Sequence, residues 1–337
     1  MTSPEFSALF DRIVDVKVGV IGDFALDLYY SIQTETGERS IETELDVHWA
    51  SQPRASLGGA GNVVQNLVAL GIQYIQVFGC VGNDLFGREM RGLFNQAGVQ
   101  TQNLLTPVAG WDTCVYTKPM RGDKEMNRID FGIHNALLDD TVNELLAGLE
   151  QCLSDLDVVI INQQFANPLL KASHIGRLNN LIERFPNVRF VVDMRHFGKL
   201  VQGATLKVNT NELARFLAIE APDEPNLDWC LQQGLRLIKS RRGPLVITRG
   251  EQGILYMDED KFQVVDGIAL QVELDTVGAG DTVVAAWAAC TGAGAKPVQA
   301  LDVANLAAAV TVQKLRQTGT ANPSEIMALH RIYYPHE

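Results

Sequence analysis

Residues 275–281, with the sequence DTVGAGD, place two carboxylates around a bare stretch of backbone. Gly278, Ala279 and Gly280 have little or no side chain, and the apolar run TVVAAWAAC that follows predicts a buried helix starting near Asp281. Small residues at a helix N-terminus let several backbone N–H groups converge on an anion. A carboxylate beside such an anion is unfavourable unless it accepts a proton from an attacking nucleophile or helps to organise a cation.

The same residues are also compatible with an ordinary helix start. In that interpretation a strand precedes Gly278, the glycine makes the turn, and Asp281 is the N-cap of the helix. Asp275, six residues before Asp281, makes capping alone the less economical explanation.

A second glycine cluster, SLGGAGNVVQNLVALG at residues 56–71, also precedes a predicted helix. Gly58 and Gly59 permit close approach of a ligand, and Asn62 offers both a donor and an acceptor, which suits sugar hydroxyls. Helix capping by Asn62 explains this segment equally well when it is taken alone. Asp23 and Asp27 follow the first predicted strand within about one turn. Their carboxylates could accept hydrogen bonds from paired hydroxyls, or they could be solvated turn residues.

Several common sites are absent from the sequence. The Rossmann fingerprint fails because Val64 and Val283 stand where its third glycine would be, and no P-loop sequence occurs. The six histidines show no zinc-ligand spacing. The five cysteines are scattered and include no C-x-x-C pair, so they favour neither a disulfide framework nor a zinc ribbon. This use of cysteine fits a reducing cytoplasm.

The composition restricts the class of partner. A formal net charge of −12 argues against general binding to nucleic acid or to an anionic membrane, since both depend on lysine and arginine. No apolar run approaches the ~18 residues of a membrane span. We therefore expect a cytoplasmic protein that binds small molecules.

Short β-branched runs alternate with stretches of helical period along most of the chain. This alternation predicts an α/β fold whose mostly parallel central sheet carries helices on both faces, with ligands at the carboxyl ends of the strands. The predicted strands are 16–22, 74–82, 158–162, 189–193, 206–209 and 245–248. The polar residues at or directly after their carboxyl ends are Asp23, Asn162, Asp193, Asn209 and Thr248.

Residues 28–56 and 112–131 break this alternation. Both contain alternating polar and apolar residues, and 112–131 reads as two strands around a turn at Arg121, Gly122 and Asp123. We expect a small β lid that protrudes from a single domain spanning residues 1–337. The edges and inner face of such a lid favour a homodimer formed through it.

Taken together, these segments resemble the PfkB/ribokinase family of sugar kinases. Residues 275–281 match its D-T-x-G-A-G-D signature, and residues 58–62 match its N-terminal glycine signature. Residues 209–212 look like its N-x-x-E, and 246–253 like its nucleotide-binding strand and turn. The order and spacing agree over nearly the whole chain, and the heptose-phosphate kinase branch is the most similar. The resemblance implies a ribokinase-like fold.

The resemblance also implies a reaction, in which the γ-phosphoryl of ATP passes to a hydroxyl of a sugar or sugar phosphate. Asp281 would be the base, and Gly278, Ala279 and Gly280 would hold the charge of the transferring group. Asn209 and Glu212 would help to place Mg²⁺ near the phosphates, with Asp275 as a further metal candidate beside which the family allows a monovalent cation. The other implied residues are Thr248, Arg249, Gly250, Gly253 and Asn305 for the nucleotide, and Asp23, Asp27, Gly58, Gly59, Asn62 and Arg128 on the second lid strand for the sugar.

The chain departs from the heptose-phosphate branch after two strands. Residues 162–167 read NQQFAN instead of an S-D-Y-x-K-G-like turn, and Arg195 stands where a D-P-K-like lysine is expected. A basic group for a sugar phosphate is thus missing unless Arg195 or Arg128 supplies it, and the acceptor stays open. The alternatives are a nucleoside or vitamin kinase of the same fold, and a non-catalytic sugar or nucleotide sensor, which would be expected to lose Asp281.

Overall fold

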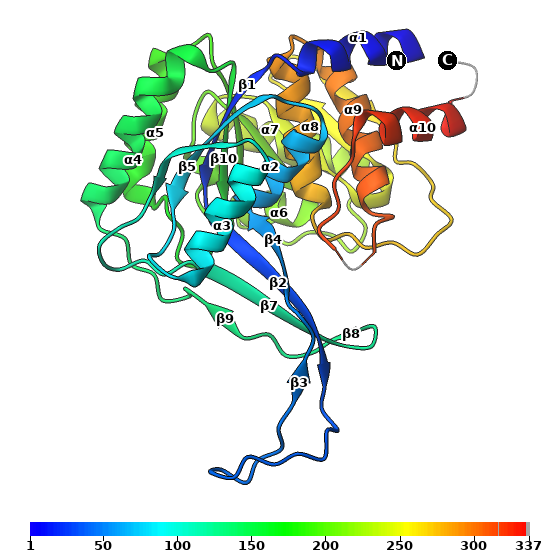
Figure 1. The fold of residues 1–337 in the computed structure, drawn as a ribbon. Helices are drawn as coiled ribbons and strands as arrows, with labels where there is room; N and C mark the ends of the chain where they lie inside the picture. The colour runs from blue at the N-terminus through cyan, green and yellow to red at the C-terminus, as the bar shows by residue number, and fades with distance from the viewer. Residues whose placement is uncertain (316, 335–337) are drawn as a thin grey trace.

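The computed structural model of the chain describes residues 1–315 and 317–334 and contains one large sheet and one smaller sheet (Figure 1). Within these residues the large sheet has the order β15-β14-β13-β12-β11-β10-β1-β5-β6. Neighbouring strands are parallel from β6 to β13, and β14 and β15 extend the sheet antiparallel. The strands are β1 (Lys17–Gly22), β5 (Tyr74–Cys80), β6 (Gln100–Leu105), β10 (Val158–Gln163), β11 (Arg189–Met194), β12 (Thr205–Asn209), β13 (Leu245–Thr248), β14 (Ile254–Met257) and β15 (Phe262–Val265).

Helices cover both faces of the large sheet, and each face has its own apolar core. One face packs against α1 (Ser3–Ile13), α2 (Ala60–Ala69), α3 (Leu85–Gln96), α8 (Ala279–Gly292), α9 (Pro297–Thr311) and α10 (Pro323–Tyr333). The other packs against α4 (Asp139–Cys152), α5 (Ala172–Arg184), α6 (Thr210–Leu217) and α7 (Leu227–Arg241). The predicted α/β class and mostly parallel sheet are thereby confirmed.

Helix α8 is buried along most of its length, as its apolar sequence predicts. Residues 282–290 are all buried, because α8 lies on the sheet and also packs against α2 and α9. Small alanines let these helices approach closely, so the N-terminus of α8 is held firmly in the core. The strand expected before Gly278 is wrong: residues 266–278 form no regular element, and the N–H of Asp275 donates to the carbonyl of Val312 at 2.8 Å.

The smaller sheet projects from the edge where β1 ends (Figure 1). It has the order β3-β2-β7-β8, with β4 also paired to β2 and β9 to β7. Its strands are β2 (Phe24–Gln33), β3 (Trp49–Ala50), β4 (Arg54–Gly59), β7 (Cys114–Arg121), β8 (Lys124–Glu125) and β9 (Asp130–Phe131). We call this sheet the projecting sheet. Since β2 starts two residues after β1 ends, and β4 ends at the residue before α2, the sheet is tied directly to the first glycine cluster.

The position of β2 corrects one prediction. Asp23 and Asp27 do not share a turn after β1, because β2 begins at Phe24 and extends the chain between them. Asp23 stays with the large sheet, and Asp27 belongs to the projecting sheet. In the described part of the chain, the helices are too short or too polar to cross a membrane.

Candidate active site

The two glycine clusters meet at the N-termini of α2 and α8. The Nδ2 atom of Asn62 donates a hydrogen bond to Oδ2 of Asp281 at 2.7 Å. The N-caps of the two helices are Gly59 and Gly278, with φ angles of 57° and 82°. Neither Asn62 nor Asp281 is therefore a capping residue, and the capping interpretation of both segments is wrong. Each side chain projects from the first turn of its helix into the space between the two helices.

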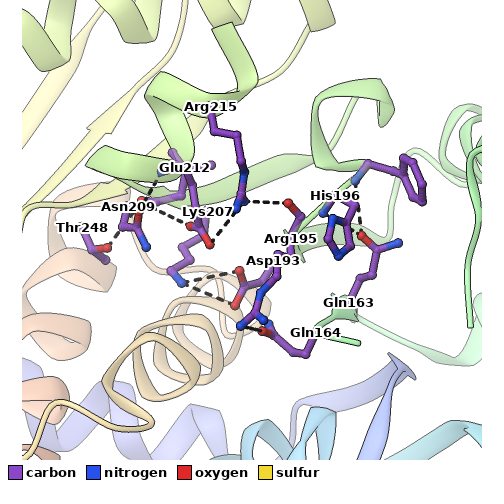
Figure 2. Close-up of polar contacts among 12 residues, drawn as sticks. Gln163, Gln164, Asp193, Arg195, His196, Lys207, Asn209, Glu212, Arg215 and Thr248 are labelled. Carbon is purple, nitrogen blue, oxygen red and sulfur yellow. Dashed lines mark hydrogen bonds and ion pairs between the residues drawn. The ribbon is translucent and has the colours of Figure 1, made fainter. Parts of the chain in front are cut away.

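A buried lysine, which the sequence analysis missed, lies against the glycine turn. The Nζ atom of Lys207 is 3.4 and 3.5 Å from the two carboxylate oxygens of Asp193, and both residues are buried (Figure 2). A Cβ placed on Gly280 would lie 2.8 Å from this Nζ, so the glycine makes room for the ammonium group. A signal was present in the sequence, since Lys207 interrupts the apolar pattern of a predicted buried strand.

Charges around this turn control the protonation of Asp281 and Lys207. Burial raises the pKa of Asp281 to about 7, with the charge of Asp193 acting in the same direction, while Asn62 and Lys207 oppose it. Burial alone would lower the pKa of Lys207, but the carboxylates of Asp193, Glu212 and Asp281 outweigh it and raise that pKa. Lys207 is thus a fixed positive charge, and Asp281 changes its protonation near neutral pH.

The projecting sheet contributes a second ion pair. The Nζ atom of Lys118 on β7 lies 3.0 Å from Oδ1 of Asp27 on β2 and donates to the hydroxyl of Tyr29 at 2.9 Å. The hydroxyl of Thr318 lies 3.5 Å from the other carboxylate oxygen of Asp27. A Cβ on Gly58 would lie 3.1 Å from that oxygen, so Gly58 lets the carboxylate pack against the backbone.

A cavity of about 200 Å³ lies between the projecting sheet and the loop that precedes α8. Tyr29, Lys118 and Met120 line it from the sheet, and Asp275 and Val277 line it from the loop. One carboxylate oxygen of Asp275 accepts the N–H of Val277 at 3.0 Å. Asp275 therefore helps to shape the turn that leads into α8, and it faces the space beneath the projecting sheet.

Asp23 organises the chain after β10. Its carboxylate accepts three backbone N–H bonds at 2.8–2.9 Å, from Gln164, Phe165 and Leu169, and its side chain is buried. Burial raises the pKa of Asp23 to about 6 although these donors favour the charged form. Both oxygens accept backbone N–H groups, so Asp23 holds the loop after β10 in place.

Asn162 stands at the end of β10 with an incomplete set of hydrogen bonds. Its side chain is 1% exposed, and neither Oδ1 nor Nδ2 has a hydrogen-bond partner among the described residues. In the sheet register it lies beside Gly22 of β1 and Asp193 of β11. A buried amide without partners is unfavourable by about 1–3 kcal/mol, so this group is suited to a ligand atom or an ordered water.

Asn209 and Glu212 form a reciprocal cap at the start of α6. The side-chain oxygen of Asn209 accepts the N–H of Glu212 at 2.8 Å, and Oε2 of Glu212 accepts the N–H of Asn209 at 2.9 Å (Figure 2). The second oxygen of Glu212 lies 4.0 Å from the guanidinium of Arg215. This cap fixes both residues at the end of β12, which is the strand next to β13. In the sheet register Asn209 lies beside Thr248, the last residue of β13.

The remaining predicted nucleotide residues lie around β13 and α9. The guanidinium of Arg249 contacts Gln252 within the turn after β13, and the N–H of Arg249 donates to the carbonyl of Gly253 at 2.9 Å. A Cβ on Gly253 would lie 2.1 Å from the carbonyl oxygen of Val265, so only glycine fits there. Gly250, like Gly253, has a positive φ. Asn305 on α9 donates to the carbonyl of Asp266 at 2.9 Å and thereby holds the loop after β15.

The two candidate contacts for a substrate phosphate have protein partners. Arg128 lies between β8 and β9, not on a strand as predicted. It contacts Asp130 at 2.7 Å and stacks over the ring of Tyr116 at 4.9 Å. Arg195 donates to the side-chain oxygen of Gln164 at 3.3 Å (Figure 2). Arg128 and Arg195 are thus tied to different loops.

The sequence is similar to that of known carbohydrate kinases and of a bifunctional protein. The model for the pfkB family carbohydrate kinase matches residues 20–325. The bifunctional protein HldE of Trichlorobacter lovleyi is 30% identical over 326 residues, which are 95% of this chain and 64% of HldE. The chain therefore spans less than two thirds of the length of this relative.

Two solved structures show the same fold. Phosphofructokinase-2 from Escherichia coli in complex with potassium has a TM-score of 0.72 at 17% identity, covering 94% of this chain and 99% of the other. The ribokinase of Arabidopsis thaliana complexed with ribose and ATP has a TM-score of 0.70 at 18% identity, covering 94% and 98%. The predicted ribokinase-like fold is confirmed.

Proposed function

Because the chain belongs to the pfkB family of carbohydrate kinases, we propose that it transfers the γ-phosphoryl of ATP to a hydroxyl of a sugar or sugar phosphate, with Asp281 as the general base. One observation carries this proposal: the hydrogen bond between Asn62 and Asp281 brings both glycine clusters to one point. A polar side chain for the acceptor then lies within hydrogen-bond distance of a carboxylate with a pKa near neutrality.

In the proposed reaction the acceptor hydroxyl loses its proton to Asp281 as its oxygen attacks the γ-phosphorus. The bond between the γ-phosphorus and the bridging oxygen breaks, and ADP leaves. A base whose pKa lies near the working pH is suited to this transfer, because it is ionised before the attack and holds the proton afterwards. The pKa of Asp281, raised to about 7 by burial, meets this requirement.

Charge on the transferring group would be held by the first turn of α8 and by Lys207. The backbone N–H groups of Gly278, Ala279 and Gly280 are at the positive end of a long buried helix. The ammonium of Lys207 reaches the same turn from β12 and is kept protonated by three carboxylates. Catalysis of phosphoryl transfer depends mainly on such positioning and charge neutralisation.

The charges around Asp281 and Lys207 also fit a divalent cation that enters with ATP. Asp193, Glu212 and Asp281 all act on one ammonium, that of Lys207, so carboxylates are in excess. Carboxylate oxygens are the ligands that Mg²⁺ prefers. Within residues 1–315 and 317–334, however, no cluster of three acidic, histidine or cysteine side chains could hold a metal by itself. We propose that Glu212, together with Asn209, binds Mg²⁺ through water and the phosphates of ATP.

When bound, Mg²⁺ would neutralise part of the charge on the phosphates. We place the nucleotide over Thr248, Arg249, Gly250 and Gly253, with Asn305 holding the adjoining loop. Asp275 shapes the turn before α8, and a monovalent cation at that turn remains part of the proposal. Phosphofructokinase-2 from Escherichia coli was solved in complex with potassium, which supports including a monovalent cation in the proposal.

The acceptor would lie between the projecting sheet and the ends of β1 and β10. Asp27 and Lys118 offer a carboxylate and an ammonium to adjacent hydroxyls, and Asn62 offers an amide that already contacts the base. Asn162 supplies a second amide from near the carboxyl end of β10, where it has no partner among the described residues. Closure of the projecting sheet over the acceptor would exclude water, which otherwise competes for the phosphoryl group.

The experiment that tests the function is an assay of ADP release with Mg²⁺ and ATP across free sugars, sugar phosphates and nucleosides. The proposal expects turnover with at least one sugar or sugar phosphate and none with nucleosides. Turnover with a nucleoside alone would point to a nucleoside kinase. Binding of ATP without turnover on any acceptor would point to a sensor.

We also propose that the protein is cytoplasmic and acts as a homodimer through the projecting sheet. Trp49 and Ile129, both in this part of the chain, are 51% and 60% exposed, which is unusual for large apolar side chains. A second copy would cover them. Sedimentation across a range of protein concentrations tests this proposal, since a mass that stays monomeric at all concentrations would contradict it.

A further inference from the structure

A line of buried polar side chains connects α9, α8 and α2 to Asp281. The hydroxyl oxygens of Thr311 and Thr282 lie 3.1 Å apart, and the hydroxyl of Thr282 lies 2.9 Å from Oδ1 of Asn66. The Nδ2 atom of Asn66 lies 3.4 Å from Oδ1 of Asn62, whose Nδ2 donates to Asp281. Thr311, Thr282, Asn66 and Asn62 are each at most 2% exposed.

The direction of this chain of hydrogen bonds is fixed by one backbone carbonyl. The Nδ2 atom of Asn66 also donates to the main-chain oxygen of Asn62 at 2.9 Å, and such an oxygen only accepts. The amide of Asn66 must therefore turn its Oδ1 towards Thr282, so Thr282 is the donor to it. If the hydroxyl of Thr282 donated instead to the carbonyl of Gly278, at 3.2 Å, the buried oxygen of Asn66 would lose its donor.

The chain of hydrogen bonds also sets the orientation of the Asn62 amide. Because Nδ2 of Asn66 faces Oδ1 of Asn62, the amide of Asn62 presents its own Nδ2 to Asp281. A donor that faces a carboxylate favours the ionised form. An amide turned by 180° would bring an oxygen against Asp281 and favour the protonated form, which is not a base.

We propose that Asn66 and Thr282 are positioning residues for the phosphoryl transfer. They hold the amide of Asn62 with its N–H towards Asp281, so that Oδ2 of Asp281 stays an acceptor and its Oδ1 receives the proton of the attacking hydroxyl. This inference rests on the proposed function, because it assumes that Asp281 is the base. It adds two residues that lie in the core and do not touch a substrate.

Other charged groups also act on the protonation of Asp281, and the test must separate their effect from that of the hydrogen-bond chain. Asp193 from β11 and Asp27 from β2 favour its protonated form, and Lys207 from β12 favours its ionised form. All three are unchanged by a substitution at Thr282. A comparison of two variants at that position therefore reports on the hydrogen-bond chain.

The test compares Thr282→Val with Thr282→Ser. Valine has the shape of threonine but no hydroxyl, whereas serine keeps the hydroxyl and loses a methyl group. In Thr282→Val the backbone carbonyl of Asn62 alone holds the amide of Asn66, because Oδ1 of Asn66 has lost the donor of Thr282. The orientation of the amides of Asn66 and Asn62 is then held less firmly. The acidic limb of the profile of kcat/KM against pH is expected to shift to higher pH by about one unit. At low pH this shift lowers kcat/KM roughly tenfold. Thr282→Ser is expected to keep the wild-type limb.

A purely structural role for the chain predicts a different result. Thr282→Val would then change the melting temperature and leave the limb where it is, and that outcome would overturn the inference. A Thr282→Ser variant that shifts the limb as much as valine does would overturn it too. Should Thr282→Val not fold, Thr311→Val interrupts the same chain one step further from Asp281 and is expected to give a smaller shift in the same direction.

A readout without turnover separates this inference from the proposed function. The carboxyl ¹³C resonance of Asp281, assigned by its disappearance in Asp281→Asn, gives the pKa of this group directly. The pKa is expected to be higher in Thr282→Val than in the wild type, whether or not Asp281 is the base. Equal pKa values in the two proteins would overturn the positioning role, while a catalytic limb that does not follow the measured pKa would contradict the assignment of the base.

Discussion

Asn62 and Asp281 are separated by 219 positions in the sequence, yet Nδ2 of the first lies 2.7 Å from Oδ2 of the second. Each residue stands in the first turn of a helix whose N-cap is a glycine with positive φ. The contact unites an amide suited to hydroxyl groups with a carboxylate next to an anion-binding turn. This pairing is what a kinase needs at the point where acceptor and phosphate meet.

The pH dependence of the reaction follows from the base. Since burial raises the pKa of Asp281 to about 7, the ionised base is scarce in mildly acidic solution. We expect kcat/KM for the acceptor to rise about tenfold per pH unit below that value and to level off above it. The measurement is a profile at saturating Mg²⁺ and ATP, so that titration of the nucleotide does not contribute. A profile that stays flat down to the ordinary pKa of an aspartate contradicts the expectation.

The same raised pKa predicts how stability depends on pH. Asp281 binds its proton more tightly in the folded than in the unfolded protein, because its pKa rises from 3.8 to about 7 on folding. This contribution to the free energy of unfolding is complete below about pH 4 and is lost as the pH rises through 7. Asp281→Asn removes the effect, so the melting temperature of the variant should exceed that of the wild type by several degrees at pH 8 and by less at pH 4.

Asp23 does not disturb that comparison. Its pKa is also raised, to about 6, and it acts on stability with the same sign. It is present in both proteins and therefore cancels in the difference. A difference in melting temperature that does not change between pH 4 and pH 8 would show that Asp281 is ionised throughout this range.

Lys207 is expected to act in catalysis and in stability, and the two effects can be separated. Lys207→Met removes a charge beside Gly280 and leaves Asp193 buried without its partner. We expect kcat/KM for ATP to fall about 10²-fold. The free energy of unfolding should fall by about 3–5 kcal/mol. Chemical denaturation and steady-state kinetics measure the two effects.

The matched control is the double variant Lys207→Met with Asp193→Asn. It removes the uncompensated charge, so most of the lost stability should return. The kinetic defect should remain, because the ammonium is still missing from the anion-binding turn. Recovery of both stability and turnover would show that Lys207 serves the fold alone.

Asn162 is predicted to recognise the acceptor. Asn162→Leu keeps the size of the side chain and removes a buried amide that has no partner among the described residues. We expect KM for the acceptor to rise by about 5- to 100-fold, with an unchanged KM for ATP and no loss of melting temperature. Ile160→Val, on the same face of β10, is the control for packing and should lower stability without changing KM. An unchanged acceptor KM in Asn162→Leu would remove this residue from the site.

Much of this site was predictable from local sequence. The strands that carry Gly22, Asn162, Asp193, Asn209 and Thr248 at or near their carboxyl ends are apolar runs, and parallel strands must bring these ends to one edge. The glycine turn and the buried helix after it were predictable from small residues followed by a long apolar run. The turn lies at Gly278, and the helix begins at Ala279, slightly before the predicted start near Asp281. These strands and this helix could be predicted because the spacing of apolar residues is visible in a single sequence.

Other features depend on pairing across the chain and were missed or wrong. Lys207 and Lys118 look like strand residues of no special role until Asp193 and Asp27 are placed beside them. The three backbone donors of Asp23 come from a distant loop, so its role in holding that loop was missed. A strand was expected before Gly278, although that segment instead hydrogen-bonds to the end of α9.

Whether Asp281 takes the proton from the acceptor hydroxyl is measured by the kcat of Asp281→Asn. Asparagine keeps the size of the side chain and its contact with Asn62, but it is not a base at neutral pH. With an acceptor that the wild type phosphorylates, ADP release should slow by about 10²–10⁴-fold. A kcat close to that of the wild type would show that Asp281 is not the base.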